Sequence, residues 1–258
     1  MENHLERYRS VWERKPVLRA VYDDFYRRIS AACVSGVTIE LGGGIGNLKE
    51  KLGNVIASDI QFAPRLDLVA DAQFLPFADA KLSNIVMVDV LHHVEYPLMF
   101  FREANRVLRP GGRIVMVEPA ITLVSFPFYR FLHQEPVRLS IDPLTGGTPK
   151  SDRHPYDSNQ AIPTLIATKY RARFHSEIPG LRLSEVKWFS VLTYPLSGGF
   201  QSWSLLNANL AKACLRIERL IEPVLGRFAG FRMLMVVEKQ QSRELWREGA
   251  ARINCFSL

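Results

Sequence analysis

The stretch from Thr38 to Asn47, TIELGGGIGN, joins a carboxylate to a glycine-rich turn. Its chemically informative residues stand at alternate positions: Glu40, Gly42, Gly44 and Gly46. Glycines adopt the left-handed backbone of a tight turn and let a ligand approach the main chain closely. A carboxylate directly before such a turn repels a phosphate group and attracts an ammonium group. The pattern therefore predicts a loop that binds a ligand through its amino group.

Further acidic residues end the apolar runs that follow. Asp59 ends the run NVIASD, Asp71 ends LDLVAD, and Asp89 stands near the end of NIVMVDV. If these runs are parallel strands, their carboxyl ends meet at one edge of the sheet, where ligands of open α/β sheets bind. The three carboxylates are therefore expected to lie near one another and to accept hydrogen bonds from a ligand.

Histidines and one glutamate supply the candidates for acid–base chemistry. His133 in FYRFLHQEP, His154 beside an aspartate and an arginine, and Glu118 at the end of RIVMVE are the predicted catalytic or acceptor contacts. His92 and His93 are adjacent, and one of them is expected to pack beneath the bound ligand. Their spacing completes no metal site, so no metal is expected.

The elements that must position these residues alternate between strands and helices. Short apolar runs without alternation are typical of buried parallel strands. A helix between the runs at 84–90 and 113–118 carries apolar residues at helical spacing and stops at Arg-Pro-Gly-Gly. The expected strands are 37–41, 54–59, 66–71, 84–90 and 113–118, with two later ones at 181–190 and 231–238. This order predicts an α/β fold with a doubly wound sheet.

The remaining segments are expected to surround that sheet. We expect an N-terminal helical arm over 1–34, a core domain over 35–240 and a polar tail over 241–258. Within the core domain, a cap follows the fifth strand at about 119–156, and a second insertion covers about 190–230. A helix is expected over 157–176, with Asp157 or Ser158 as its N-cap. Another helix, over 204–225, carries an apolar stripe that is expected to pack on the sheet, with membrane docking as the alternative.

These landmarks, in this order, resemble the class I S-adenosylmethionine-dependent methyltransferases of the small-molecule, type 11-like group. ELGGGIG resembles the family's first motif, E/D-x-G-x-G-x-G, and FREANRVLRPGGRIVMVEP closely follows its later segment. In that family an acidic residue after the second strand holds the ribose, which corresponds to Asp59. Another after the third strand lies near the adenine, which corresponds to Asp71, followed by Ala72. The specific motifs cover residues 37–119.

The resemblance implies a Rossmann-like sheet, mostly parallel with an antiparallel last strand, and S-adenosyl-L-methionine as cofactor, with S-adenosyl-L-homocysteine as product. The residues it implies for cofactor binding are Glu40, Gly42, Gly44, Gly46, Asp59, Asp71, Ala72, Asp89 and His92. The implied reaction is methyl transfer to a small-molecule or glycan- or lipid-linked acceptor, first of all on oxygen. The acceptor atom and the oligomeric state stay open.

Two other functions fit parts of the pattern. A nicotinamide-dependent oxidoreductase uses a related sheet, but Glu40 and Asn47 depart from the G-x-G-x-x-G pattern that cradles a pyrophosphate. A non-catalytic protein that retains the cofactor site is the second alternative. Binding of S-adenosylhomocysteine rather than NAD would separate the first of these from a methyltransferase.

Composition limits the partners. The 258 residues are 47% hydrophobic and carry a formal charge of +7. The positive charge fits a solvated basic surface, an acceptor with phosphate or sugar, or peripheral contact with an acidic membrane. No nucleic-acid motif and no apolar run of about 18 residues occurs, and no signal peptide is expected. Three scattered cysteines form no disulfide framework, so a cytoplasmic location is expected.

Overall fold

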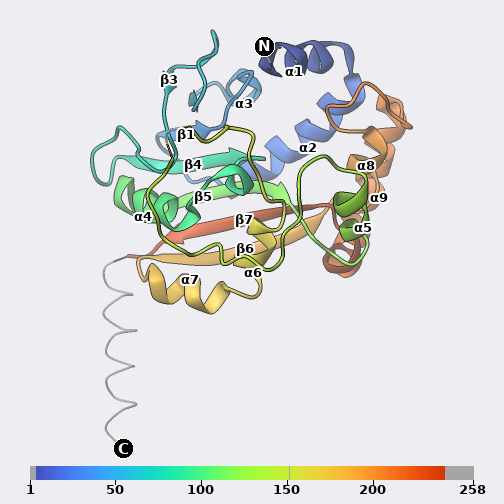
Figure 1. The fold of residues 1–258 in the computed structure, drawn as a ribbon. Coiled ribbons are helices and arrows are strands. Elements are labelled where there is room, and N and C mark those ends of the chain that lie inside the picture. Colours follow the sequence, from blue (N-terminus) through green and yellow to red (C-terminus); the bar gives the residue numbers. More distant parts are fainter. Residues whose placement is uncertain (1–3, 151, 242–258) are drawn as a thin grey trace, which may run out of the picture.

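The computed structural model describes residues 4–150 and 152–241 (Figure 1). A single mixed sheet of seven strands has the order β3-β2-β1-β4-β5-β7-β6. Its strands are β1 (Thr38–Leu41), β2 (Val55–Asp59), β3 (Leu68–Val69), β4 (Leu82–Val88), β5 (Leu108–Pro119), β6 (Leu181–Phe189) and β7 (Arg232–Lys239). The first five are parallel, and β7 runs antiparallel to both β5 and β6. The predicted fold class, including the antiparallel last strand, is confirmed.

Helices cover both faces of the sheet. On one face lie α2 (Pro16–Ala32) and α3 (Asn47–Leu52), and on the other lie α4 (Pro97–Val107), α6 (Ile162–Ala167) and α7 (Arg171–Glu177). Two buried apolar clusters correspond to these faces: Phe25 and Leu48 belong to one, Phe100 and Phe174 to the other. Because both faces are covered, the central strands carry continuous apolar runs, at residues 85–88 of β4 and 114–117 of β5.

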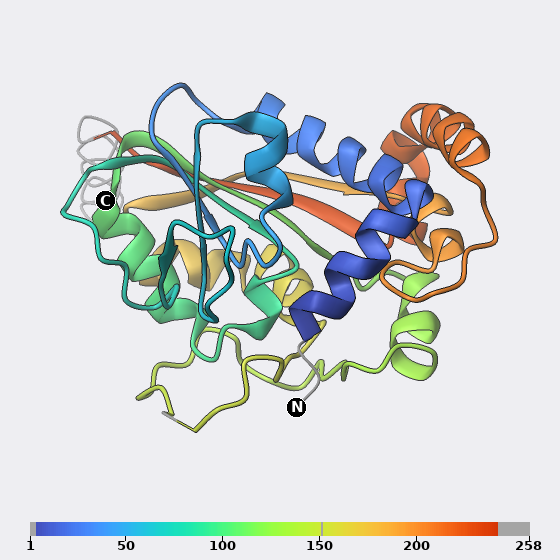
Figure 2. The same ribbon diagram turned by 90° about the horizontal axis from the view of Figure 1, so that it is seen from above.

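The other elements gather around the carboxyl ends of the parallel strands. They are the arm helix α1 (His4–Arg14), the 3-10 turn η1 (Leu91–His93), α5 (Ser125–Phe131), α8 (Thr193–Ser197) and α9 (Ala208–Ala229). In Figure 1 the arrows of β4 and β5 point to the side on which α5 and α8 lie, and Figure 2 shows α1 and α2 crossing the sheet from above. Among the described residues, no helix has both the length and the hydropathy of a membrane span.

The N-terminal arm is fastened to the segment that follows α8. Lys15 stands between α1 and α2, and its buried ammonium donates to the carbonyls of Gly199, Gln201 and Trp203 at 2.7–2.8 Å. Nearby, the ring of Tyr8 packs on Phe200 with centroids 4.9 Å apart. A charged side chain with three carbonyl partners satisfies its hydrogen bonds although it is buried. The arm is therefore held against the same edge of the sheet as the predicted site.

The predicted helix over 157–176 is wrong in two respects. The structure has two short helices, α6 and α7, because the backbone of Thr168 leaves the helical region with φ −121° and ψ −89°. The N-cap is Ala161 rather than Asp157 or Ser158. Asn159 instead receives the amide of Ala161 on its side-chain oxygen and donates its own main-chain N–H to His92. These hydrogen bonds of Asn159 connect the segment to η1. The spacing of apolar residues in the sequence does not indicate such a contact.

The helix α9 packs against β6 of the sheet, as expected, but its apolar stripe faces outward and does not make that contact. Ile217 and Val224 are 60% and 72% exposed, and Leu210 is about half exposed. The helix packs instead through small and polar residues, including Ala211 and the buried Glu218, which accepts the amide of Thr193 at 2.7 Å. Membrane contact through the exposed stripe stays a prediction, and the predicted polar tail lies, from residue 242 onward, outside the described residues.

Candidate cofactor and acceptor site

The glycine loop turns sharply after β1. Gly42, Gly44 and Gly46 have φ values of +72°, +51° and +77°, a region that other L-residues rarely adopt. At Gly42 a side chain is also excluded by space, because its Cβ would lie 2.2 Å from a methyl group of Val90. The loop is closed by the amide of Gly43, which donates to Ser58 at 2.7 Å. The alternate glycines of the sequence are thus required by the turn itself.

Glu40 is buried beneath this loop with one oxygen unused. It is 4% exposed, and its Oε2 has no hydrogen-bond partner within the described part of the chain. Burial, together with the nearby charge of Asp59, raises the pKa of Glu40 to about 8. A buried carboxylate without a partner is costly, and a bound cation removes that cost. The geometry agrees with the predicted contact to an ammonium group.

Asp59 and Asp71 lie at the carboxyl ends of two paired strands. In the parallel ladder of β2 and β3, Asp59 pairs with Val69. Asp71 follows Val69 by two residues and therefore lies at the same end of the sheet as Asp59. The carboxylate of Asp59 accepts the amides of Gly44 and Gln61, each at 3.0 Å, and its pKa is raised by burial. Asp71 accepts the amide of Gln73 at 2.8 Å, with Ala72 between them. The structure brings both acids to the edge that holds the glycine loop, and their cofactor contacts stay predictions.

Asp89 lies at this edge too but is paired within the protein. Its positive φ of 59° turns the chain after β4, and both carboxylate oxygens bind the guanidinium of Arg232 at the start of β7. Arg232 is 2% exposed and stacks on the ring of Tyr194, 3.9 Å from its centroid. The hydroxyl of Tyr22 donates to Asp89 at 3.3 Å. Asp89 is therefore paired with Arg232 within the protein, and its contact with the cofactor stays a prediction.

Glu118, His92 and Glu135 form a buried chain of hydrogen bonds. One oxygen of Glu118 accepts the amides of Val90 and Leu91 at 2.9 and 2.7 Å, and the other lies 2.7 Å from Nδ1 of His92. Nε2 of His92 lies 3.2 Å from Glu135. Burial opposes a charge on His92, but the two carboxylates outweigh it and raise its pKa to about 10. Glu118, predicted as a base, has each oxygen occupied and therefore holds His92 in place.

The three other histidines of this region differ in the nitrogen that they leave free. His93 directs Nδ1 to the carbonyl of Asp157 at 3.3 Å; a carbonyl only accepts, so Nδ1 bears the proton and Nε2 has a lone pair. His133 and His154 accept amides on Nδ1, from Glu135 and Tyr156, each at 3.2 Å. When neutral, both therefore carry their proton on Nε2. Burial lowers the pKa of His93 to about 4.

The hydrogen bonds of His133 and His154 thus leave neither neutral ring an open lone pair, whereas His93 has one on Nε2, although burial makes it a weak base. That His133 or His154 acts as the base stays a prediction without support from the hydrogen bonding. Glu135 and Arg232 were not predicted from the sequence, because they lie 43 and 143 positions along the chain from their partners His92 and Asp89. Glu135 stands only two residues after His133, but nothing in FLHQEPV indicates that it contacts His92.

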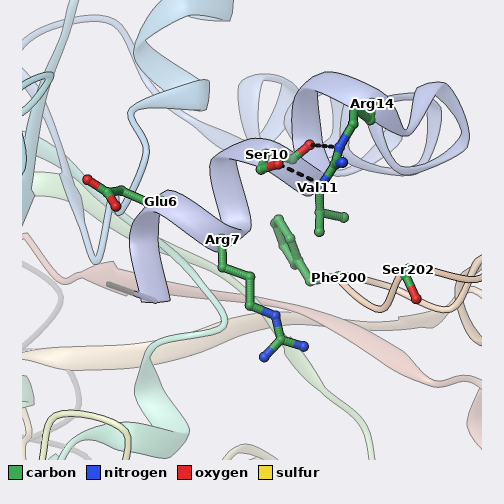
Figure 3. A pocket seen from close by; sticks show the side chains of 7 residues that line it. All are labelled: Glu6, Arg7, Ser10, Val11, Arg14, Phe200 and Ser202. Atoms are coloured by element: carbon green, nitrogen blue, oxygen red, sulfur yellow. Dashed lines mark hydrogen bonds between the residues drawn. The ribbon is translucent and has the colours of Figure 1, made fainter. Parts of the chain in front are cut away.

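A separate hollow of about 410 Å³ lies between α1 and the segment that follows α8 (Figure 3). It is lined by Glu6, Arg7, Ser10, Val11, Arg14, Phe200 and Ser202. Arg14 is held against the helix by Ser10, to whose carbonyl and hydroxyl it donates at 3.1 and 2.7 Å. None of the predicted cofactor residues is among these lining residues, so this hollow is distinct from the glycine loop.

The sequence of this chain is similar to those of known methyltransferases. Residues 39–116 match the sequence model of the family described as methyltransferase domain. A ubiquinone/menaquinone biosynthesis C-methyltransferase of Teredinibacter turnerae is 33% identical over 31% of this chain and 41% of its own. A demethylmenaquinone methyltransferase of Paenarthrobacter aurescens is 26% identical over 62% of this chain and 65% of its own. The matches thus span less than two thirds of either relative.

A solved structure supports the fold. A protein of Thermotoga maritima described as a SAM-dependent methyltransferase, possible histamine N-methyltransferase, aligns with a TM-score of 0.53. The alignment covers 92% of this chain and 99% of that one at 16% identity, which is a likeness of fold. The domain match begins in β1 and ends in β5, and it therefore contains the glycine loop and all three strand-end aspartates. The match over residues 39–116 and the shared fold together support a class I S-adenosylmethionine-dependent methyltransferase.

Proposed function

We propose that the protein transfers a methyl group from S-adenosylmethionine to a hydroxylated small molecule with an apolar part. The observation that carries the proposal is the unpartnered carboxylate of Glu40 beneath a glycine loop whose far side is closed by Asp59. An acid with a free oxygen suits the amino group of the cofactor, and a second acid at the end of the neighbouring strand suits its ribose. The residues present therefore fit the cofactor that the family uses.

The cofactor, when bound, supplies a methyl carbon on a positively charged sulfur, ready for in-line displacement. The protein's task is to position the acceptor and to exclude water. The glycine loop leaves the main chain open to approach, and the arm covers it: a Cβ placed on Gly44 would lie 3.6 Å from Leu5 of α1. The arm thus lies where it can exclude water from the methionine end of the cofactor.

The acceptor is proposed to lie beyond the carboxyl ends of β4 and β5, against the cluster His92, His93 and Glu135. A hydroxyl there can donate to the free Nε2 of His93, and loss of its proton makes the acceptor nucleophilic. Oxygen is our first choice of methylated atom. A ring carbon next to the hydroxyl is the alternative, favoured by the two relatives, whose names concern quinone methylation. A sugar- or phosphate-containing acceptor draws support only from the basic charge of the chain.

An apolar part of the acceptor finds exposed apolar side chains beside this edge. Leu123 and Val124 precede α5 and are 80% and 51% exposed, while Phe131 ends that helix. Surfaces of this kind are common where a protein meets an apolar ligand or a membrane. They support a lipid-like acceptor rather than a fully hydrated one.

The first test is cofactor binding. Isothermal titration calorimetry with S-adenosylhomocysteine and with NAD separates the methyltransferase from the nicotinamide-dependent alternative. We expect saturable binding of S-adenosylhomocysteine and none of NAD. Transfer from isotopically labelled S-adenosylmethionine to a panel of quinols, phenols and hydroxylated lipids then tests catalysis by mass spectrometry. Cofactor binding without any labelled product across the panel and a cell extract would favour the non-catalytic alternative.

A further inference from the structure

His92, His93 and Glu135 are brought together from two distant segments with their donor atoms converging. One ligand atom from each side chain lies within 4.8 Å of the other two. Nε2 of His92 is 3.2 Å from Glu135 Oε2, and Nε2 of His93 is 3.9 Å from Oε1. Metal–ligand bonds of roughly 2.0–2.2 Å place neighbouring donor atoms roughly 3.0–3.5 Å apart. The observed separations are close to those of a metal centre.

The partners of the two imidazoles prepare both rings for a metal. The carboxylate of Glu118 already accepts two main-chain amides and therefore accepts the Nδ1 proton of His92. The carbonyl of Asp157 takes the Nδ1 proton of His93. Metal-binding histidines commonly donate their other ring N–H to a carboxylate or a carbonyl, which fixes the tautomer and the ring direction. Both Nε2 atoms are thereby directed toward Glu135, and a bound ion would take the place of the proton that His92 carries on Nε2.

The third ligand is held as well. The buried side chain of Gln160 donates its amide to Glu135 Oε2, and its own main-chain N–H is bound to the carbonyl of Pro136 at 3.0 Å. Glu135 and His93 are half-buried, whereas His92 is 2% exposed. The cluster is thus closed on the His92 side and accessible on the side of the other two ligands.

We propose that His92, His93 and Glu135 bind a divalent transition-metal ion. Two imidazoles and one carboxylate suit Zn²⁺, Fe²⁺, Co²⁺ or Ni²⁺. Three protein ligands leave coordination positions for an outside oxygen. Resting on the function proposed above, the ion would bind the hydroxyl of the methyl acceptor and lower its pKa, so that the proton leaves to solvent. Nε2 of His93 would then be a ligand of the ion and would no longer accept that proton. The acceptor class is then narrowed to molecules with a metal-binding oxygen, such as a catechol, a hydroxyquinol or an enolisable ketone.

The test uses the full chain after treatment with a chelator and titration with Co²⁺, whose visible absorption reports ligand number. We expect saturable uptake of one ion per chain. Glu118→Gln removes the hydrogen-bond partner of a ligand and should weaken metal uptake by roughly 10–100-fold. His93→Asn and Glu135→Gln each remove a ligand itself and should weaken uptake by more than that factor. His175→Asn is the matched control, since His175 lies on α7 against the carbonyl of Leu181, and it should leave uptake unchanged.

The two proposals fail separately. Binding of S-adenosylhomocysteine is measured on the same samples, so each variant is also checked for folding. Absence of saturable Co²⁺ and Zn²⁺ uptake by a chain that binds S-adenosylhomocysteine would overturn the metal site and leave the methyltransferase intact. Equal uptake by the wild type, His93→Asn and Glu135→Gln would overturn it too. Metal uptake without cofactor binding would instead contradict the proposed function.

Discussion

The two halves of the sheet's ligand-binding edge hold their buried carboxylates in opposite ways. On the cofactor side, Glu40 keeps one oxygen without a partner in the part of the chain that the structure describes. On the acceptor side, Glu118 uses both of its oxygens and Asp89 is bound by Arg232. An unpartnered acid is prepared for a ligand's cation, whereas a partnered acid fixes its neighbours. The half predicted to hold the cofactor thus has an acid prepared for a ligand's cation, and the half proposed to hold the acceptor has a preformed framework.

The largest expected effect comes from breaking the acceptor-side pair. Among the described residues, Arg232→Met leaves the carboxylate of Asp89 with the weak contact to Tyr22 alone. The free energy of unfolding should therefore fall by about 3 kcal/mol. This is the lower end for a broken buried pair, because Asp89 is 27% exposed. Urea denaturation followed by circular dichroism measures it. Lys51→Ala removes an ion pair with Asp23 whose side chains are both half exposed, and this control should cost less than about 1 kcal/mol. Equal losses in the two variants would mean that the buried pair has no special role.

Next in size is the effect of Glu40 on cofactor binding. Glu40→Gln should weaken S-adenosylhomocysteine binding by about 1.5–3 kcal/mol, the usual contribution of a hydrogen bond to a charged group. It should not destabilise the free protein, because it removes a buried acid rather than a bonded one. Calorimetry and urea denaturation measure the two quantities. A variant that binds normally but unfolds more easily would reverse the contrast between the halves.

The same residue makes binding depend on pH. The folded-state pKa of Glu40 is about 8, above its ordinary value of 4.5, so the free protein carries the proton at pH 6 and must release it to hold an ammonium group. Affinity should therefore rise by roughly tenfold per pH unit from pH 6 toward pH 8 and then level off. For the free chain the sign is opposite: the stability contributed by Glu40 is present below about pH 4.5 and is lost as the pH rises to about 8. Calorimetry between pH 6 and 9 tests the binding, and Glu40→Gln should remove this dependence.

The smallest effect separates the two roles of Asp59. Asp59→Ala removes the acceptor of the Gly44 and Gln61 amides as well as the predicted ribose contact. Asp59→Asn keeps one oxygen that can accept from the loop but loses the charge. We expect both variants to weaken S-adenosylhomocysteine binding. Only Asp59→Ala should lower stability, by about 1 kcal/mol, because Asp59 is only partly buried and water replaces part of the two lost hydrogen bonds. Thermal melts with and without the ligand compare them. Unchanged affinity in both variants would remove Asp59 from the cofactor site.

The residues of each half could be predicted to the extent that contacting residues lie close to recognisable strand ends in the sequence. Glu40, the glycines, Asp59 and Asp71 each stand at the end of an apolar run, so the expectation that strand ends share an edge was enough to bring them together. The pairing of Asp89 with Arg232 joins β4 to β7, and no local pattern links them. The outward stripe of α9 was likewise misread, because periodicity identifies an apolar face but not what covers it.

The sequence by itself determined where the first strands lie, the glycine turn and the acids beside it, because each depends on backbone geometry within a few residues. Only the tertiary structure decided which histidine keeps a free nitrogen, that Glu118 positions His92, and that Glu135 joins them. Those outcomes depend on hydrogen bonds between segments that the chain separates by tens of residues. A side chain's protonation and direction are set by its partners in space, and a one-dimensional pattern does not contain them.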